Sequence, residues 1–171
     1  EIIKKDFDIP VFAMGYYNPI FANLENNIRM LSEVGCEGII IPDINVEEMR
    51  IIKPIVRKNK LKMVGFVAPN TGNFRIRQIV RYTDGFIYLV SSYGTTGIRD
   101  RIDFSHLSGI VNQVKKVKDI PVAIGFGIRD AKMIDEAKKV SDGAIVGSAI
   151  IKAIIDNPKN YLDSISKFFR G

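Results

Sequence analysis

Short apolar runs alternate with longer segments of mixed polarity along the chain. Six runs are almost continuously apolar and rich in β-branched residues, which is typical of parallel strands buried on both faces. Between them, apolar residues recur every three or four positions, as in amphipathic helices. The pattern predicts an α/β protein of repeated strand–helix units. The expected strands are Pro10 to Met14, Gly38 to Pro42, Lys62 to Val67, Gly85 to Ser91, Pro121 to Gly125 and Gly143 to Gly147.

Capping signals mark several of the expected helices. Gly35 stands where a helix C-terminus favours glycine, and Asp130 precedes a helix as an N-cap residue would. Asn157 followed by Pro158 indicates an N-cap and a first helical residue, which would open the last helix. No linker or low-complexity segment interrupts the pattern. We therefore expect residues 1–171 to form a single domain of βα units with right-handed crossovers.

Two architectures can be built from such units, an open doubly wound sheet and a closed barrel. An open dinucleotide-binding sheet begins with a Gly-x-Gly-x-x-Gly turn after its first strand, and Gly15 to Pro19 does not provide one. Glycines instead end the last two strands, where phosphate-binding barrels hold their phosphate. The sequence thus favours a (β/α)8 TIM barrel of the phosphate-binding type. About six of the eight βα units are present, and about two are expected ahead of Glu1.

Glycine at both of these strand ends suits an anion site. The two segments are Gly125 to Gly127 and Gly147 with Ser148. Backbone without Cβ lets a phosphate approach the amide N–H groups, and the following helix N-terminus adds the positive end of its dipole. Tight packing between strand and helix would also select glycine, but two neighbouring strand ends favour phosphate. The chain is therefore expected to hold a small phosphorylated metabolite.

A long connection rich in Gly and Thr joins Ser91 to the helix expected over Phe104 to Lys118. Connections of about a dozen residues are uncommon in compact βα units and often close over an active site. We interpret this segment as a lid, with a disordered surface loop as the alternative.

Other candidate groups have structural explanations beside chemical ones. Asp43 ends a strand and could be catalytic, but capping the next helix or orienting a neighbouring backbone is favoured. Cys36 is expected to be a small core residue rather than a nucleophile. The aromatic residues Tyr16, Tyr88 and Phe126 could line a flat apolar pocket or belong to an ordinary core.

Composition narrows the function classes. Hydrophobic residues make up 46% of the chain, which argues against disorder, and no apolar run reaches the length of a membrane span. The net charge of +6 comes from scattered residues, so neither nucleic acid nor a membrane is expected as a partner. The single cysteine excludes an internal disulfide and fits a reducing cytoplasm, and no metal-ligand spacing is visible.

Seven segments, in their order along the chain, resemble the alpha subunit of tryptophan synthase. The resemblance covers essentially the whole chain, from the third barrel strand to the C-terminus. Other phosphate-binding barrels share the last two elements but not the full set. The segments are Phe12 to Pro19, Gly38 to Asp43, Val67 to Thr71, Gly85 to Ser91, Gly94 to Gly97, Gly125 to Ile128 and Val146 to Ile151.

The resemblance implies a cytoplasmic lyase of tryptophan biosynthesis that cleaves indole-3-glycerol phosphate to indole and glyceraldehyde 3-phosphate. It implies an α2β2 complex in which a beta subunit bearing pyridoxal phosphate (PLP) receives the indole, with no cofactor in this chain. By position, it assigns phosphate binding to Gly97, Gly127, Gly147 and Ser148. It assigns the substrate pocket and lid to Tyr16, Ile40, Phe66, Tyr88, Thr96 and Phe126, and the partner interface to Asn18 and Pro19 in a loop that runs to Phe21.

The family's two acidic catalytic residues belong to the second barrel strand and the loop after it. The resemblance therefore implies no catalytic residue in this chain, with both acids upstream of Glu1. Two alternatives stay open: another phosphosugar-binding barrel enzyme, and a non-catalytic fragment that binds and modulates a beta subunit. A substrate panel would test the first, and stimulation of a beta subunit without indole release would favour the second.

Overall fold

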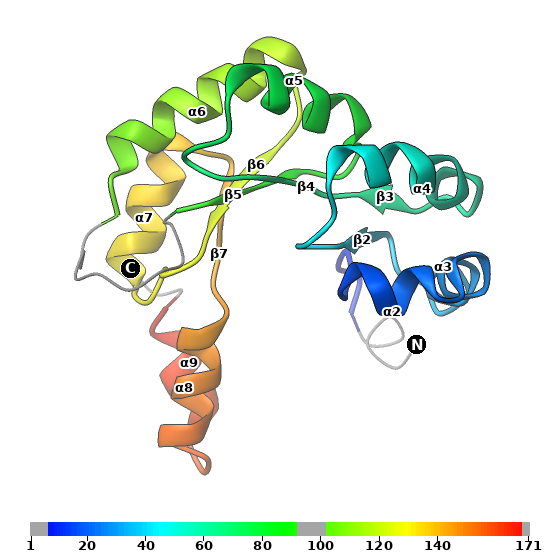
Figure 1. Ribbon diagram of the computed structural model, residues 1–171. Coiled ribbons are helices and arrows are strands. Elements are labelled where there is room, and N and C mark those ends of the chain that lie inside the picture. The colour runs from blue at the N-terminus through cyan, green and yellow to red at the C-terminus, as the bar shows by residue number, and fades with distance from the viewer. Residues whose placement is uncertain (1–6, 92–101, 169–171) are drawn as a thin grey trace. The chain divides into compact units, whose positions relative to one another are not determined.

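A computed structural model describes residues 7–91 and 102–168 (Figure 1). Strands and helices alternate, and β1 with β2, β2 with β3, and β6 with β7 pair in parallel. The chain forms two compact units. The first contains the described residues up to 66 and residues 72–87, and the second contains residues 67–71 and the described residues from 88 onward. The single domain expected from the sequence stays a prediction.

The first unit is built on a three-stranded sheet with the order β1-β2-β3. Its strands are β1 (Phe12–Met14), β2 (Gly38–Ile40) and β3 (Lys62–Met63), and its helices are α2 (Tyr17–Phe21), α3 (Leu24–Glu33), α4 (Val46–Lys58) and α5 (Asn73–Tyr82). The apolar stripes of the helices supply its core, which includes Ile28, Met49, Ile52 and Ile76.

The second sheet has the order β4-β5-β6-β7. Its strands are β4 (Gly65–Val67), β5 (Ile87–Val90), β6 (Val122–Gly125) and β7 (Gly143–Ile145). The helices of the second unit are α6 (Phe104–Val117), α7 (Ala131–Val140), α8 (Ser148–Asp156) and α9 (Tyr161–Ser166). Leu107, Val114, Val122 and Ile124 are fully buried and form the core of this unit.

All six predicted strands are confirmed, although the third is divided. Val64 separates β3 from β4 because the chain changes its hydrogen-bonding partner there. The Val64 N–H donates to Ile39 O at 3.1 Å, whereas the Gly65 N–H donates to Phe86 O at 3.1 Å. One apolar run therefore contributes to both sheets.

Helix ends follow the predicted caps in most places. Asp130 accepts a hydrogen bond from the Met133 N–H at 2.8 Å, as expected of an N-cap. Gly35, with φ of +87°, ends α3 in the left-handed conformation. The Cys36 N–H then donates to Leu31 O at 3.0 Å, which completes a Schellman motif. Because it belongs to this helix-ending turn, Cys36 is half-buried rather than part of the core.

Two predictions of local structure were wrong. The last helix begins at Tyr161 with Asn160 as its N-cap, not at Asn157. Asn157 instead ends α8, where its N–H donates to Ala153 O at 3.2 Å, and its own carbonyl accepts from the Asn160 N–H. The segment from Asn18 to Phe21 is part of helix α2 rather than a loop.

An aspartate links a helix to a strand in the first unit, by accepting from a strand N–H and pairing with a helix lysine; we call this arrangement an aspartate clip. Asp84 Oδ1 accepts a hydrogen bond from the Met63 N–H at 2.8 Å, and Asp84 Oδ2 pairs with Lys53 Nζ. The carboxylate, just before the chain enters β5, thereby joins β3 to a lysine of α4.

The same arrangement recurs in the second unit. Asp142 Oδ2 accepts from the Val122 N–H at 2.8 Å and pairs with Lys115 Nζ of α6 at 2.9 Å. Burial raises the pKa of the Asp142 carboxyl, but the hydrogen bonds from Lys115 and the Val122 N–H outweigh it, so that the pKa lies below its ordinary value. The hydrogen bond with Asp142 also raises the pKa of Lys115. The carboxylate is therefore most stable in its charged form.

Large apolar side chains remain exposed in both units. In the first, Met14 and Tyr16 lie beside a cavity of about 270 Å³ lined by Ala13, Met14, Gly15, Ile20, Asn27, Met30, Leu31 and Ile39. In the second, they lie on α8 and α9, where Ile151, Ile155 and Leu162 are exposed. Clustered exposed apolar surface of this kind is typical of faces that pack against further protein.

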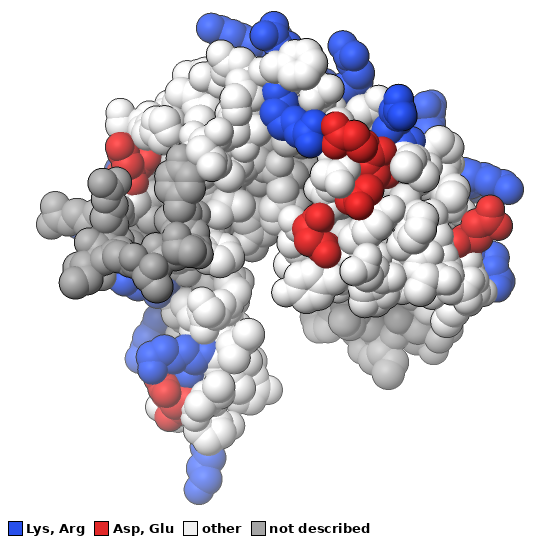
Figure 2. All heavy atoms as spheres, viewed as in Figure 1, with Lys and Arg blue, Asp and Glu red and all other residues white. Residues whose placement is uncertain are grey.

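Charged side chains lie over the outer helices. On the face shown in Figure 2, lysine and arginine are spread out, and several lie beside acidic residues. Arg75 of α5 pairs with Glu47 of α4 at 2.8 Å, which is one such contact between exposed side chains. Within residues 7–91 and 102–168, no helix is both long and apolar enough to cross a membrane.

Candidate functional site

The two predicted phosphate-binding strand ends lie at the same edge of the second sheet. Strands β6 and β7 are parallel, and Gly125 is opposite Ile145 in their register. Gly127 and Gly147 each follow two residues after that pair. Because the carboxyl ends of parallel strands meet at one edge, the register brings both glycine segments to neighbouring positions.

The segment after β6 has an unusual backbone. Phe126 has φ of +75° and Gly127 has φ of +76°, so two consecutive residues adopt left-handed values. For Gly127 this conformation carries no steric cost, whereas a residue with a Cβ adopts it rarely. The phenylalanine side chain is 57% exposed. An exposed aromatic residue held in a strained conformation is a feature of functional loops.

Gly125 and Gly127 are glycines for different reasons. A Cβ at Gly125 would collide with the ring and hydroxyl of Tyr88, so close packing explains that glycine. Among the described atoms, a Cβ at Gly127 would meet only Ser91 Oγ, at 3.9 Å, so its positive φ and not crowding by these atoms favours glycine. The tight-packing alternative therefore applies to Gly125 alone in this segment.

Two residues, Tyr88 in β5 and Ser91 directly after it, hold the backbone around Phe126. The Ser91 hydroxyl donates to Phe126 O, and the Ser91 N–H donates to Gly125 O at 2.9 Å. The Tyr88 hydroxyl also forms a hydrogen bond with the Phe126 backbone. Burial raises the pKa of the Tyr88 hydroxyl although this hydrogen bond opposes the shift, so the group is neutral near pH 7.

Gly147 and Ser148 form the second glycine segment. Gly147 is the N-cap of α8, and its carbonyl accepts from the Ile150 and Ile151 N–H groups. The N–H groups in the first turn of a helix have no acceptor within that helix. Both Gly147 and Ser148 are exposed, and no described atom lies within 4 Å of a Cβ built at Gly147. Packing does not explain this glycine, which leaves its backbone open to a ligand.

The predicted pocket residues fall in both units. In the first, the Gly15 N–H donates to Ile40 O at 3.1 Å, which places Tyr16 next to the end of β2. Tyr16 is 68% exposed, so it does not belong to the core. Phe66 is half-buried in β4. In the second, Tyr88 and Phe126 are joined by the hydrogen bond described above.

Three of the predictions concern residues outside those described. Thr96 and Gly97 lie within residues 92–101, and so does most of the segment interpreted as a lid. Their assignments stay predictions.

Asp43 has the structural role that the sequence favoured. Its Oδ1 accepts a hydrogen bond from the Tyr17 N–H at 2.8 Å, so it orients a neighbouring backbone at the start of α2. It does not cap the following helix, because Asn45 takes that position in a capping box with Glu48. Asp43 thereby fixes the helix that presents Asn18 and Pro19, both of which are exposed.

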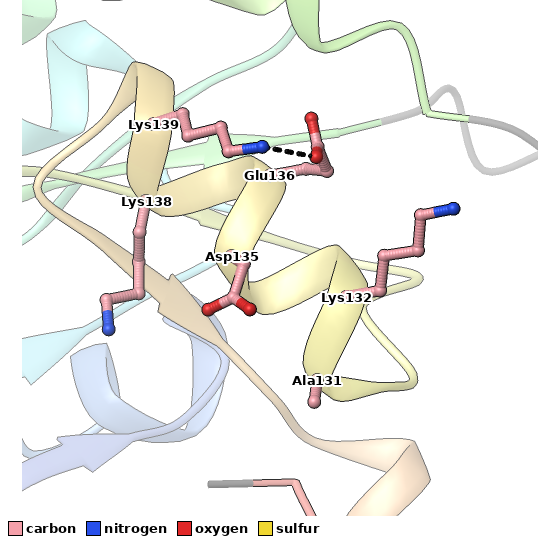
Figure 3. A pocket seen from close by; sticks show the side chains of 6 residues that line it. All are labelled: Ala131, Lys132, Asp135, Glu136, Lys138 and Lys139. Atoms are coloured by element: carbon pink, nitrogen blue, oxygen red, sulfur yellow. Dashed lines mark hydrogen bonds and ion pairs between the residues drawn. The ribbon is translucent and has the colours of Figure 1, made fainter. Parts of the chain in front are cut away.

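A surface hollow on α7 is not a candidate site. Figure 3 shows that all the residues lining it come from this one helix: Ala131, Lys132, Asp135, Glu136, Lys138 and Lys139. Lys139 Nζ pairs with Glu136 Oε1 at 2.7 Å, and both side chains are solvated. The hollow is the polar face of an amphipathic helix. The described residues also contain no group of three or more His, Cys, Asp or Glu side chains that could hold a metal ion.

The repeated βα units, parallel strand pairing and glycine-terminated strands place the chain in the (β/α)8 barrel class of proteins. The family model for the tryptophan synthase alpha chain matches residues 1–169. The chain therefore belongs to the tryptophan synthase alpha chain family.

Relatives of known sequence and structure agree with this assignment. The tryptophan synthase alpha chain of Alkaliphilus metalliredigens is 36% identical over 169 residues, which cover 97% of this chain and 63% of that protein. The alpha chain of Chloroflexus aggregans is 40% identical over 152 residues, which cover 88% and 57% of the two. The alpha subunit from Pyrococcus furiosus matches with a TM-score of 0.81 and 30% identity, over 98% of this chain and 67% of that one. The chain thus spans about three-fifths of the length of the two curated relatives.

Proposed function

We propose that this chain provides the substrate-binding part of a lyase that cleaves indole-3-glycerol phosphate to indole and glyceraldehyde 3-phosphate. The observation that carries the proposal is the pair of glycines at neighbouring strand ends, neither of which is explained by packing against the described residues. Family membership supports the choice of substrate among phosphate esters. The proposed pathway is tryptophan biosynthesis, in the cytoplasm.

The phosphate of the substrate binds the backbone N–H groups around Gly127 and Gly147 and the hydroxyl of Ser148. Backbone N–H groups and the N-terminus of α8 favour an anion without requiring a buried lysine or arginine. Gly97 completes the phosphate site by family position. The exposed position of Gly147 and Ser148 supports this role, because a ligand can reach them from solvent.

By family position, the indole ring binds among apolar side chains that belong to the strands or directly follow them. Tyr16, Ile40, Phe66, Tyr88 and Phe126 are the proposed lining residues, and Thr96 belongs to the proposed lid. Flat aromatic side chains suit a planar indole because they offer large apolar area with few rotatable bonds. The exposure of Tyr16 and Phe126 supports a role in binding rather than in the core.

Cleavage of the carbon–carbon bond requires proton delivery to the indole ring and proton removal from the glycerol hydroxyl. By family position, the proposal assigns these steps to none of the residues in this chain. Asp43, the carboxylate at the end of β2, is engaged by the Tyr17 N–H. The two acids would come from the upstream part of the barrel. The proposed partner is a beta subunit that carries the PLP, in an α2β2 complex, and it would contact α2 at Asn18 and Pro19.

Titration with indole-propanol phosphate, which lacks the hydroxyl groups needed for cleavage, tests the proposal. The chain contains no tryptophan, so the fluorescence of the ligand's indole can be followed without a protein indole background. We expect saturable binding that glycerol 3-phosphate competes away. Indole-propanol without the phosphate is the matched ligand, and it should bind at least about tenfold more weakly because it gains no hydrogen bonds from the glycine segments. Equal affinity for the two ligands would contradict the phosphate assignment.

A further inference from the structure

Ser91 holds the two peptide groups on either side of Phe126. The residue directly follows β5 and is only 8% exposed. Its N–H donates to Gly125 O at 2.9 Å, and its hydroxyl donates to Phe126 O. These carbonyls belong to the 125–126 and 126–127 peptide groups, so one buried serine fixes two consecutive peptide planes.

The second of these planes contains the N–H of Gly127. In a trans peptide the C=O and N–H bonds point in opposite directions. A hydrogen bond that draws Phe126 O toward the buried Ser91 hydroxyl therefore turns the Gly127 N–H away from Ser91. Gly127 is exposed, so this direction leads toward solvent, where a ligand would lie.

The conformation that Ser91 holds is one that Phe126 does not prefer. Phe126 has a Cβ and a φ of +75°, and such strained residues persist only where their surroundings over-determine them. Without the Ser91 hydroxyl, the carbonyl of Phe126 loses a partner and the peptide is free to rotate toward an ordinary conformation. The Gly127 N–H would rotate with it.

We propose that Ser91 is a positioning residue for phosphate binding, which acts by orienting the Gly127 N–H toward the anion. The inference rests on the proposed function, because it assigns Ser91 to the support of the same phosphate site. Ser91 does not touch the ligand in this role. The residue contributes by preorganising a donor, which reduces the cost of ordering the loop when phosphate binds.

The test is a titration of the ¹⁵N-labelled chain with glycerol 3-phosphate, followed through the amide shifts of Gly127 and Gly147. We expect Ser91→Ala to weaken binding about five- to tenfold, and to reduce the shift change at Gly127 more than the change at Gly147. Ser91→Cys keeps nearly the same volume with a weak donor and should behave in the same way, which provides a second variant if alanine impairs folding.

Ser141 offers a matched control in the same unit. Its hydroxyl donates to Ala137 O at 2.8 Å and to Gly143 O at 3.0 Å, at the opposite end of β7 from the glycine segment. Ser141→Ala also removes a serine hydroxyl that bonds backbone carbonyls, so it should cost similar stability. We expect it to leave the affinity for glycerol 3-phosphate unchanged.

A double-mutant cycle tests the route through Phe126. Glycine accepts positive φ without strain, so in a Phe126→Gly background the loss caused by Ser91→Ala should fall to about twofold or less. The inference is overturned if the wild-type chain binds glycerol 3-phosphate and Ser91→Ala binds it equally well, or if the loss is undiminished in the Phe126→Gly background. Absence of binding by the wild-type chain would instead overturn the proposed function, and the inference with it.

Discussion

Alanine at Gly147 and at Gly127 separates ligand binding from folding. Gly147 has a negative φ of −122°, and a Cβ there meets no described atom within 4 Å. Gly127 also has room for a Cβ, but its φ is +76°. The two substitutions therefore place the same methyl group in the same proposed phosphate site, with a left-handed backbone at Gly127 only.

The expected stabilities follow from these geometries. A left-handed residue with a Cβ costs roughly 1–2 kcal/mol, and the loss of glycine from the unfolded chain returns about 0.4–1 kcal/mol. Gly127→Ala should therefore lower the free energy of unfolding by about 1 kcal/mol. At Gly147 the poorer N-cap and the lower unfolded-state entropy nearly offset each other, so Gly147→Ala should change stability by less than about 0.5 kcal/mol.

Affinity should respond in both variants. A methyl group at either glycine keeps the phosphate oxygens from the backbone N–H groups, and we expect at least about a tenfold loss, or roughly 1.4 kcal/mol. Urea unfolding gives the stability, and titration with indole-propanol phosphate gives the affinity under native conditions. Wild-type affinity in the well-folded Gly147→Ala variant would refute the reasoning, since only occupation of the site distinguishes that variant from the parent.

Three further predictions concern stability, each measured by urea unfolding. Because the native pKa of Asp142 lies below its usual value, the pair with Lys115 stabilises the fold above about pH 4, and this stabilisation is lost as the pH falls through the native pKa. Asp142→Asn should therefore reduce the fall in the free energy of unfolding at acid pH, and an unchanged fall would contradict the prediction. Lys60 ends α4 with φ of +61°, so Lys60→Gly should stabilise by about 0.5–1 kcal/mol, whereas Gly35→Ala at the equivalent position of α3 should destabilise. Gly38→Ala should destabilise by about 1–3 kcal/mol, because its Cβ would collide with the Phe12 ring in β1 and the Lys62 carbonyl in β3, and a neutral result would refute that packing.

Features set by neighbouring residues were predictable from the sequence. Gly35 and Asp130 act within one helical turn, and their caps are present as expected. The start of the last helix was mispredicted because Asn157 could either cap the N-terminus of that helix or end α8, and it ends α8. Local pattern does not decide between a C-cap and an N-cap when the two helices are almost adjacent.

Features set by distant residues were not predictable. The division of the third strand at Val64 depends on which strands lie on either side of it. A structural role was predicted for Asp43, but not its partner, the N–H of Tyr17, which is 26 residues away. Ser91 likewise binds the carbonyl of Phe126, which is 35 residues away. The left-handed conformation of Phe126 was not predictable either, because this conformation is expected from the sequence at glycine or asparagine and not at phenylalanine.

The aspartate clips have a consequence for how the chain acquires order during synthesis. Each clip takes its lysine from one helix, its N–H from the strand that follows, and its carboxylate from the segment between the next helix and its strand. A clip is therefore complete once two successive helices and the strand after each of them have been made, and it needs nothing made later. As the polypeptide leaves the ribosome, the module around Asp84 can lock its strand against its helix while the residues around Asp142 are still untranslated. The nascent chain can thus gain fixed register from its N-terminal side onward, one module at a time.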